Sequence, residues 1–401
     1  MINLEIPKKF QPLVAQANQV ATEVFRPISR KYDGDDHAYP KELDMLASLI
    51  DGMNEGSEHG ASGATGVRRG KADGENRNGS NLSTVLGIIE LCWGDVGLLL
   101  SLPRQGLGNS AIASVATEEQ LEHYGGKWAA MAITEPEAGS DSAAIRTTAE
   151  LDGDEYVLNG EKIFVTAGDR ADLIVVWATL DRSKGRAAIK SFIVERDNPG
   201  LKLDRLEPKL GIRASDTANF ILQDCRVPKD ALLGSPEIDT KRGFGGAMQT
   251  FDNTRPLVAG MAVGVARAAL EETRKRLEDA GIEIDDAAPA LTQHAAAARF
   301  IELEADYEAS LLLTLQAAWM ADNSKPNSLE ASMAKAKAGR ACVDITLGCV
   351  ELCGSAGYGE DDLLEKWARD AKILDLFEGT QQIQLLIVAR QLLGKSSSEL
   401  R

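Results

Sequence analysis

The spacing of apolar residues divides the chain into three regions, of which the first and the last are helical and the middle one is rich in β-structure. Apolar positions recur at helical spacing in residues 10–25 and again in residues 82–100, which predicts helices there. Between them, residues 51–80 are polar and Gly-rich and show no periodicity. So long a stretch is either a functional loop or a disordered segment, and the sequence leaves both open.

Short runs of β-branched and aromatic residues alternate with turn residues over positions 131–235. The dipeptide Asn159-Gly160 stands between two such runs and predicts the turn of a β-hairpin. Further strands are expected at residues 172–179, 187–194 and 218–222. The pattern therefore predicts a small β-barrel or sandwich between two helical regions.

Long Ala- and Leu-rich segments fill the last region, from residue 245 to residue 394. Gly, Pro or Asp/Asn clusters separate them, which places helix ends at those points. The expected helices span residues 260–279, 290–321, 328–353, 363–373 and 382–393. Antiparallel helices with short connections are typical of a helical bundle.

Composition and charge exclude several classes of protein. The chain has 44 Lys and Arg against 61 Asp and Glu, a net charge of −17. This argues against binding to nucleic acid or to anionic membranes, because phosphate binding needs clustered cations. No apolar run approaches the ~20 residues of a membrane span. The opening residues, MINLEIPKKF, lack the basic and apolar stretches of a secretory signal.

The cysteines and histidines limit the chemistry. Five cysteines are an odd number and do not indicate a disulfide framework, so we expect a reducing, cytoplasmic location. The four histidines show no HExxH spacing, and we expect no metal site. This scarcity also weakens any Ser–His or Cys–His nucleophile. A P-loop and a GxGxxG motif are both missing, which argues against a Rossmann nucleotide site.

Two short motifs hold candidate chemistry. Residues 133–141 (ITEPEAGSD) could offer backbone N–H groups and hydroxyls to a polar ligand, or they form an ordinary turn bonded to its own backbone. Glu378 follows an apolar run and precedes a helix that Thr380 is expected to cap. It is either a desolvated carboxylate whose pKa is raised, as a general base needs, or a solvent-facing residue that favours the helix dipole.

Five blocks of sequence, in order and in spacing, resemble the acyl-CoA dehydrogenase family over nearly all of the chain. They are ITEPEAGSD (133–141), LNGEKIFVT (158–166), GIRASDT (211–217), FDNTRP (251–256), and RDAK (369–372) through FEGTQQIQ (377–384). The resemblance implies an α+β multidomain fold. Its parts would be an N-terminal α-helical domain (1–130), a central β-barrel domain (131–240) and a C-terminal four-helix bundle (241–401).

The resemblance also implies an activity in fatty acid β-oxidation, the FAD-dependent oxidation of an acyl-CoA thioester to the 2,3-enoyl-CoA. A carboxylate removes the weakly acidic α-proton while hydride passes from Cβ to flavin N5, and hydrogen bonds to the thioester oxygen stabilise the enolate. Glu378 matches the family's base. Some relatives carry the base at the position of Thr254, whose hydroxyl cannot act so. The family's usual electron acceptor is an electron-transferring flavoprotein.

By the same matching, several other residues are expected to bind the cofactor or the substrate. Flavin contacts are expected from Ile133, Thr134, Ser140, Phe164 and Thr166, with Phe164 packed by the ring. Thr380 and Gln382 match contacts to the phosphate and adenosine parts of FAD, and Ser140, Asp252 and Arg255 match contacts to the CoA thioester. The alternative for Asp252 and Arg255 is an ion pair within the chain at a helix start.

Three stretches depart from the family pattern. The family's Arg-x-x-Phe-Gly element is replaced by EDAGIE at residues 278–283, a Gln by Glu351, and a compact loop by residues 51–80. In homotetrameric relatives the lost Arg, Phe and Gln hold the FAD diphosphate and adenine of a neighbouring subunit, and Glu351 would repel a diphosphate.

The chain thus resembles one subunit of the actinobacterial heteromeric α2β2 acyl-CoA dehydrogenases, in which a paralogous subunit would complete the FAD site. A non-catalytic partner subunit and an acyl-CoA oxidase of the same fold stay open as alternatives.

Overall fold

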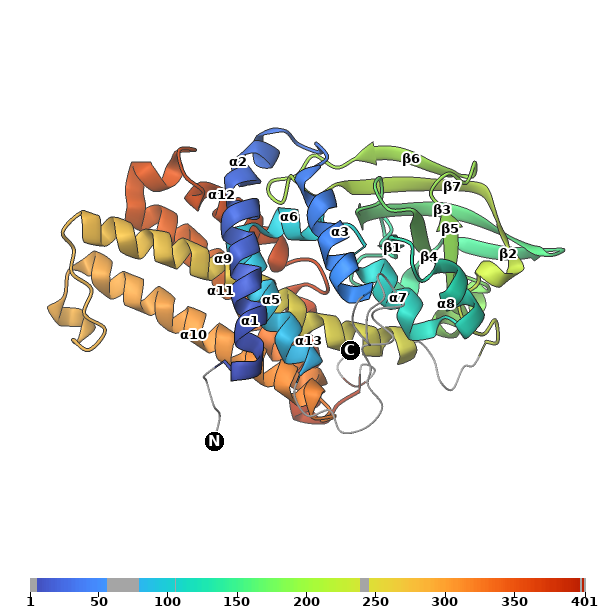
Figure 1. Cartoon of the computed structure of the whole chain (residues 1–401). Helices are drawn as coiled ribbons and strands as arrows, with labels where there is room; N and C mark the ends of the chain where they lie inside the picture. The colour runs from blue at the N-terminus through green and yellow to red at the C-terminus, as the bar shows by residue number, and fades with distance from the viewer. Residues whose placement is uncertain (1–5, 56–78, 105, 239–244, 397–398, 400–401) are drawn as a thin grey trace.

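The structure is a computed structural model, and it describes residues 6–55, 79–104, 106–238, 245–396 and 399. Figure 1 shows long helices at one end of the molecule and a β-sheet at the other, with the N-terminal helices across the middle. The expected order of a helical, a β and a second helical region is confirmed. Short 3₁₀ helices connect these elements at Lys8–Phe10, Ser142–Ala144, Arg182–Ala188, Lys229–Ala231 and Ala290–Thr292.

The first region is helical, as its apolar spacing predicts. It contains α1 (Gln11–Val20), a π-helical turn (Ala21–Phe25), α2 (Arg26–Gly34), α3 (Glu42–Glu55), α5 (Ser80–Gly94), α6 (Val96–Leu100), α7 (Leu107–Val115) and α8 (Glu118–Tyr124). The expectation of an aperiodic stretch from residue 51 is wrong for residues 51–55, which continue α3, because the apolar spacing of Leu46, Ile50 and Met53 extends through them. Residues 56–78 lie outside the described part of the chain.

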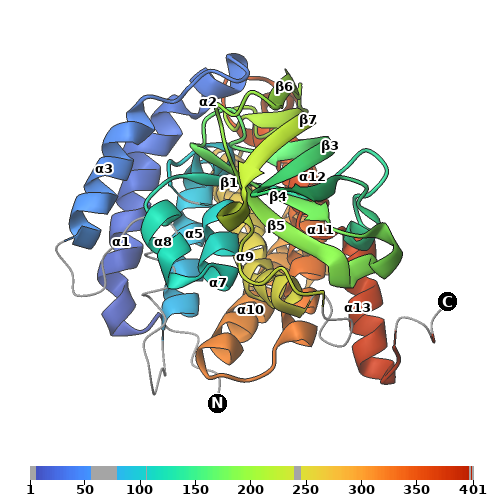
Figure 2. The same cartoon turned by 90° about the vertical axis from the view of Figure 1, so that its right-hand side faces the viewer.

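The middle region forms one curled, seven-stranded sheet (Figure 2). Its strands are β1 (Ala129–Ala132), β2 (Thr148–Asp152), β3 (Glu155–Thr166), β4 (Leu173–Thr179), β5 (Ile189–Glu195), β6 (Leu201–Leu206) and β7 (Thr217–Pro228). The order is β1-β4-β2-β3-β7-β6, with β5 also paired to β4. Every residue of β4 is buried, because α7 and α8 pack residues such as Ile112 and Leu121 into the same core.

The predicted hairpin turn at Asn159-Gly160 is wrong. Strand β3 runs without a turn from Glu155 to Thr166, and the tight turn lies earlier, at Gly153 (φ +63°), between β2 and β3. Gly160 instead marks a register shift against β7. A Cβ atom there would lie 2.4 Å from Thr147 Oγ1, so this position needs glycine for a close approach rather than for a turn.

The last region contains the helices α9 (Gly245–Asp279), α10 (Ala295–Asp322), α11 (Ser328–Tyr358), α12 (Leu364–Leu374) and α13 (Gln381–Leu393). Four of them begin or end within a few residues of the expected positions. Helix α9 begins at Gly245 rather than near residue 260, because the helix continues through Pro256, a residue that usually ends one. Residues of α5, α9, α10, α11 and α12 share one core.

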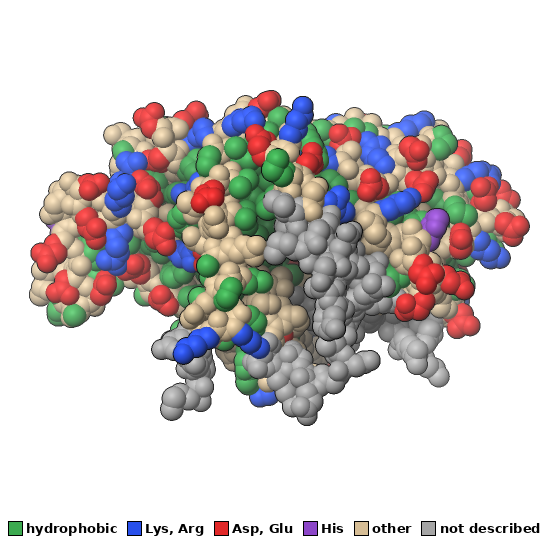
Figure 3. Space-filling view, in the orientation of Figure 1, with side chains coloured by type: hydrophobic (Ala, Val, Ile, Leu, Met, Phe, Trp, Pro, Cys, Tyr) green, Lys and Arg blue, Asp and Glu red, His purple; other side chains and the backbone are tan. Residues whose placement is uncertain are grey.

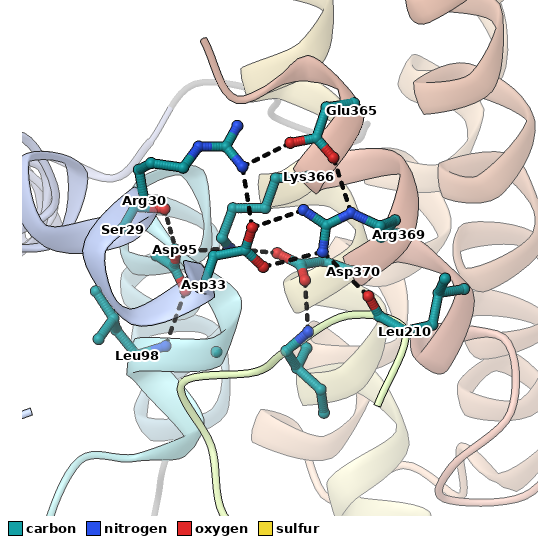
Figure 4. Close-up of polar contacts among 12 residues, drawn as sticks. Ser29, Arg30, Asp33, Asp95, Leu98, Leu210, Glu365, Lys366, Arg369 and Asp370 are labelled. Carbon is teal, nitrogen blue, oxygen red and sulfur yellow. Dashed lines mark hydrogen bonds and ion pairs between the residues drawn. The ribbon is translucent and has the colours of Figure 1, made fainter. Parts of the chain in front are cut away.

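A cluster of buried ion pairs joins the three regions where α12 begins (Figure 4). Asp33 of α2 accepts two hydrogen bonds from Arg369 at 2.9 and 2.6 Å, and Lys366 pairs with Asp95 at 2.8 Å and with Asp370 at 2.5 Å. Asp370 also accepts the Ile212 backbone N–H from the β-region. These contacts, which we call the interdomain ion-pair cluster (Asp33, Asp95, Lys366, Arg369 and Asp370), fix the helix that leads to Glu378.

The surface carries both signs of charge. On the face shown in Figure 3, Lys and Arg side chains are scattered among Asp and Glu rather than gathered in one patch. Of the helices in the described ranges, none combines the length and the hydropathy that a membrane crossing requires.

Candidate active site

Glu378 lies in the short segment between α12 and α13, in a backbone conformation that few residues adopt. Its φ is +56° and that of Gly379 is +91°. The side-chain amide of buried Gln384, in the second turn of α13, donates to the carbonyl oxygens of Glu378 (3.1 Å) and Gly379 (3.3 Å). Thr380 caps α13 as expected, because its hydroxyl accepts the N–H of Ile383. The first turns of α13 therefore fix the strained segment that carries Glu378.

The Glu378 carboxylate is half-buried and surrounded by protein on most sides. Thr254 of α9 donates its hydroxyl hydrogen to Oε2 at 3.1 Å. Burial raises the pKa of Glu378, while the Thr254 hydrogen bond and the charges of Lys335 and Arg255 partly oppose this rise. Of the two interpretations that the sequence leaves open, the structure supports the desolvated carboxylate over the solvent-facing one.

Arg255 lies next to Thr254 and is 4% exposed. Its Nη1 donates to Ser332 Oγ of α11 at 3.4 Å, which ties two helices of the bundle together. Because α9 begins ten residues before Arg255, the expectation of a helix start at this position is wrong. The side chain of Asp252 lies outside the described residues, so its predicted roles stay predictions.

The Ile133–Asp141 segment follows β1 and is held by a buried ion pair. Glu135, 5% exposed, accepts hydrogen bonds from Lys162 Nζ (2.7 Å), from the N–H groups of Arg146 and Thr147, and from the Thr147 hydroxyl. Lys162 Nζ also donates to the carbonyl oxygen of Ile133 at 3.1 Å, and burial lowers the pKa of Lys162 to about 8. The segment is therefore more than a turn bonded to its own backbone, although Asp141 does accept the Ala143 N–H.

Phe164 presents an aromatic ring to the surface from a constrained backbone. Its φ is +59°, its side chain is 59% exposed, and its N–H donates to Asn219 Oδ1 at 3.0 Å. A register shift between Lys162 and Val165 turns the ring outward. The neighbouring N–H of Ile163 donates to the carbonyl oxygen of Thr134 at 2.9 Å, so Phe164 and Thr134 lie close together. An exposed ring beside backbone and hydroxyl groups suits a planar ligand that is polar at one edge.

The structure thus brings the predicted residues together in two groups. Ile133, Thr134, Phe164 and Thr166 lie at the ends of β1 and β3, and Thr254, Arg255, Glu378 and Thr380 lie in the bundle. Ser140 and Gln382 are exposed near one group and the other. Among the described residues, neither Glu378 nor Phe164 makes a hydrogen bond to the other group.

Sequence reasoning missed three features that support the site: Lys335, Gln384 and the Glu135–Lys162 pair. Gln384 and Glu135 stand within the matched motifs, but nothing in the local pattern shows that they are buried. Lys335 could have been noted from the sequence, because it lies at helical spacing from Ser332 and Gly339 and therefore on the apolar side of α11. A lysine on an apolar stripe is unusual enough to be noted.

Comparisons with known proteins place these observations in a family. The model described as "Acyl-CoA dehydrogenase, middle domain" matches residues 130–225, and "Acyl-CoA dehydrogenase, C-terminal domain" matches residues 241–393. A short-chain specific acyl-CoA dehydrogenase of Clostridium acetobutylicum is 34% identical over 364 residues, covering 87% of this chain and 93% of that protein.

Two solved structures are similar over nearly the whole chain. The butyryl-CoA dehydrogenase of Megasphaera elsdenii is 30% identical with a TM-score of 0.83, covering 98% of this chain and 100% of the other. A chain in a structure of the electron transferring flavoprotein of Acidaminococcus fermentans is 31% identical with a TM-score of 0.79, covering 98% and 100%.

Proposed function

This chain belongs to the acyl-CoA dehydrogenase family of FAD-dependent oxidoreductases, and we propose that Glu378 is the base with which it oxidises an acyl-CoA to the 2,3-enoyl-CoA. The observation that carries this assignment is the placement of Glu378. Its backbone is fixed at φ +56°, Thr254 bonds to one carboxylate oxygen, and burial raises its pKa. A carboxylate with a raised pKa is a stronger base for a weakly acidic α-proton.

The residues at the ends of β1 and β3 fit the flavin ring of FAD. The exposed ring of Phe164, held out by a strained backbone, offers an apolar face, and Ile133, Thr134 and Thr166 stand beside it. When bound, FAD accepts the hydride that leaves the β-carbon of the substrate. We propose that Thr380 and Gln382, at the start of the 13-residue helix α13, hold its phosphate and adenosine part, because helix N-termini favour anions.

We also propose that Ser140, Asp252 and Arg255 contact the CoA thioester. A hydrogen bond to the thioester oxygen stabilises the negative charge that develops when the α-proton leaves. The buried Arg255 lies next to Thr254, the hydrogen-bond partner of Glu378, so its charge acts on both the base and the developing enolate.

The three domains expected from the sequence remain our proposal for the chain. The described strands fall between Ala129 and Pro228, and the first bundle helix begins at Gly245. Both facts support boundaries near residues 130 and 240.

Replacing Glu378 by Gln tests the base. The amide that the Glu378→Gln variant carries cannot accept the proton, so we expect turnover of butyryl-CoA to fall at least a hundredfold. The melting temperature should not fall, because an ionised carboxylate with a raised pKa destabilises the fold above that pKa and the amide does not ionise. Glu360→Gln, at an exposed glutamate between α11 and α12, should leave turnover unchanged. Retained turnover in Glu378→Gln would contradict the assignment.

We further propose that the chain works with a paralogous subunit. Glu278, Asp279 and Glu351, which stand where homotetrameric relatives carry cofactor-binding groups, are all exposed at the end of α9 and on α11. Exposed carboxylates there repel a diphosphate, and a partner subunit would supply the missing cations.

The stoichiometry of FAD tests this assembly. We expect little FAD in the chain purified alone, and one FAD per pair of subunits after co-expression with a neighbouring paralogue, measured by flavin absorbance and by the mass of the assembly. A single-component tetramer with four tightly bound FAD would exclude the heteromeric proposal. An electron-transferring flavoprotein is the proposed acceptor, and an assay for hydrogen peroxide during turnover distinguishes it from direct oxidation by O2.

A further inference from the structure

Helix α11 packs directly against the segment that carries Glu378. A Cβ atom on Gly339 would lie 2.6 Å from the carbonyl oxygen of Leu374, so α11 touches the end of α12 at this point. Lys335 lies one helical turn before Gly339 on the same face of α11. Its side chain is only 1% exposed, and Asp375 and Glu378 are the carboxylates whose charges act on it.

The ammonium group of Lys335 is buried with no hydrogen-bond partner within the described ranges. Burial lowers the pKa of Lys335 to about 8, and the charges of Asp375 and Glu378 raise it against that effect. The two carboxylates therefore favour the charged form of Lys335. A buried cation of this kind is costly unless carboxylates nearby offset it.

The charged groups around Lys335 come from α9, from α12 and from the segment after α12. Arg255 projects from α9 and bonds to Ser332 of α11, and Asp375 and Glu378 come from the segment after α12. Lys372 of α12 pairs with Asp375 Oδ2 at 3.0 Å. In α13, the buried Gln384 is neutral, and the side chain of Asp252 is not described.

This arrangement gives the two carboxylates different partners. Asp375 already has an ion-pair partner on its outer side, the half-exposed Lys372. Within the described ranges, the carboxylate of Glu378 accepts its hydrogen bond from the neutral hydroxyl of Thr254, and the positive charges of Lys335 and Arg255 also act on it. The charge of Lys335 is thus balanced by Asp375 and, after it, by the ionised form of Glu378, and Asp375 is shared with Lys372.

We propose that Lys335 is a positioning residue for the base: its buried ammonium group holds Glu378 in the ionised, proton-accepting form. This inference rests on the proposed function of Glu378. When Glu378 takes the α-proton, the buried ammonium group of Lys335 has one negative charge fewer to balance it, which favours return of the proton to solvent. Lys335 never touches the substrate in this scheme.

The test uses proton exchange apart from oxidation. Acetyl-CoA has α-protons but no β-carbon, so the exchange of its methyl protons in D2O, followed by NMR, reports proton abstraction alone. The purified enzyme with its FAD is measured over a range of pD. Loss of a nearby opposite charge raises a carboxyl pKa by about one unit or more. We therefore expect Lys335→Met to move the midpoint of the exchange rate against pD upward by about one unit. The exchange rate should then fall about tenfold below the wild-type midpoint and hardly at all well above it.

Two further variants separate charge from packing. Lys335→Arg keeps the charge and should keep the midpoint within a few tenths of a unit. Lys337→Met is the matched control, because Lys337 lies on the same helix but is paired with Asp306 at the surface. It should behave as the wild type. Should Lys335→Met not fold, Lys335→Gln removes the same charge and keeps a polar group in its place.

The role of Lys335 is overturned if Lys335→Met or Lys335→Gln gives the same dependence of exchange rate on pD as the wild type. The proposed function fails in a different way, if the wild type neither exchanges acetyl-CoA protons nor oxidises butyryl-CoA. Suppose that the wild type is active, that Glu378→Gln is inactive and that Lys335→Met keeps the wild-type midpoint. Glu378 would then remain the proposed base, and only the proposed role of Lys335 would be wrong.

Discussion

At the scale of single residues, the candidate site depends on side chains that lock an unfavourable backbone. Glu378 and Phe164, the proposed base and the proposed ring contact, both have positive φ values. Each is fixed by a side-chain amide, Gln384 for the first and Asn219 for the second. Such conformations persist only where the surroundings hold them, and they concentrate at functional sites.

Gly379→Ala tests this lock. The residue has a φ of +91°, and a Cβ atom would lie 2.4 Å from Gln384 Nε2. We expect Gln384 to lose its two hydrogen bonds, the free energy of unfolding to fall by about 1–3 kcal/mol, and turnover to fall at least tenfold. Denaturant unfolding and butyryl-CoA kinetics measure these effects. Gly126→Ala, where no atom lies within 4 Å, is the control, and equal behaviour of the two variants would contradict the argument.

At the scale of elements, the edge of the sheet that faces the proposed flavin site is organised by charge as well as by the strand ladder. Strand β3 carries two register shifts, and between them Lys162 is directed into the core to reach Glu135. That pair holds the loop after β1 in place. The loop can therefore present Ile133 and Thr134 without a regular strand behind it.

Lys162→Met should destabilise the protein by about 3 kcal/mol near neutral pH, because it leaves a buried carboxylate without its counter-charge. In the wild type, burial acts to raise the pKa of Glu135, but the charge and hydrogen bond of Lys162 lower it below its usual value. The variant loses this effect, so the difference in the free energy of unfolding between wild type and variant should shrink as Glu135 is protonated in acid. Urea unfolding at several pH values measures it. Lys184→Met, at an exposed lysine, should show no deficit.

The sequence predicted regular elements well and special ones poorly. Helices such as α11 and α12 follow from apolar spacing, which local sequence records. The predictions of a turn at Asn159-Gly160 and of a helix start near residue 260 were wrong for one reason. Gly160 and Pro256 usually mark a turn or a helix end, and here β3 and α9 continue through them. Glu378 was found by motif. Lys335 was not, because its importance arises only when α11 meets the end of α12.

At the scale of the whole molecule, the interdomain ion-pair cluster makes the three regions depend on one another. Asp33 and Arg369 form two hydrogen bonds between the first and the last region, and Asp370 binds the backbone of the β-region. Burial acts to raise the pKa of Asp33, but the hydrogen bond from Arg369 and the charges of Lys366 and Arg369 outweigh it, and the pKa is lowered.

Asp33→Asn should therefore lower the free energy of unfolding by about 3 kcal/mol at pH 7. A carboxyl with a lowered pKa stabilises the fold above its unfolded pKa of about 4 and loses this effect as the pH falls through the folded value. The difference between wild type and variant should thus narrow below about pH 4. Urea unfolding as a function of pH measures it. Asp361→Asn, at an exposed residue, should match the wild type at every pH, and a constant deficit of Asp33→Asn would contradict the argument.

The interdomain ion-pair cluster also sets an order of events during synthesis. Asp33 and Arg369 are 336 positions apart, so at ribosomal rates Asp33 is synthesised on the order of tens of seconds before Arg369. Until then the N-terminal helices lack their ion pair with Arg369. The strands can fold earlier, because their pairing is complete by Pro228. The segment with Glu378 follows Arg369 directly. A growing chain can therefore fold the strands that we propose to bind the flavin before it contains Glu378, the proposed base.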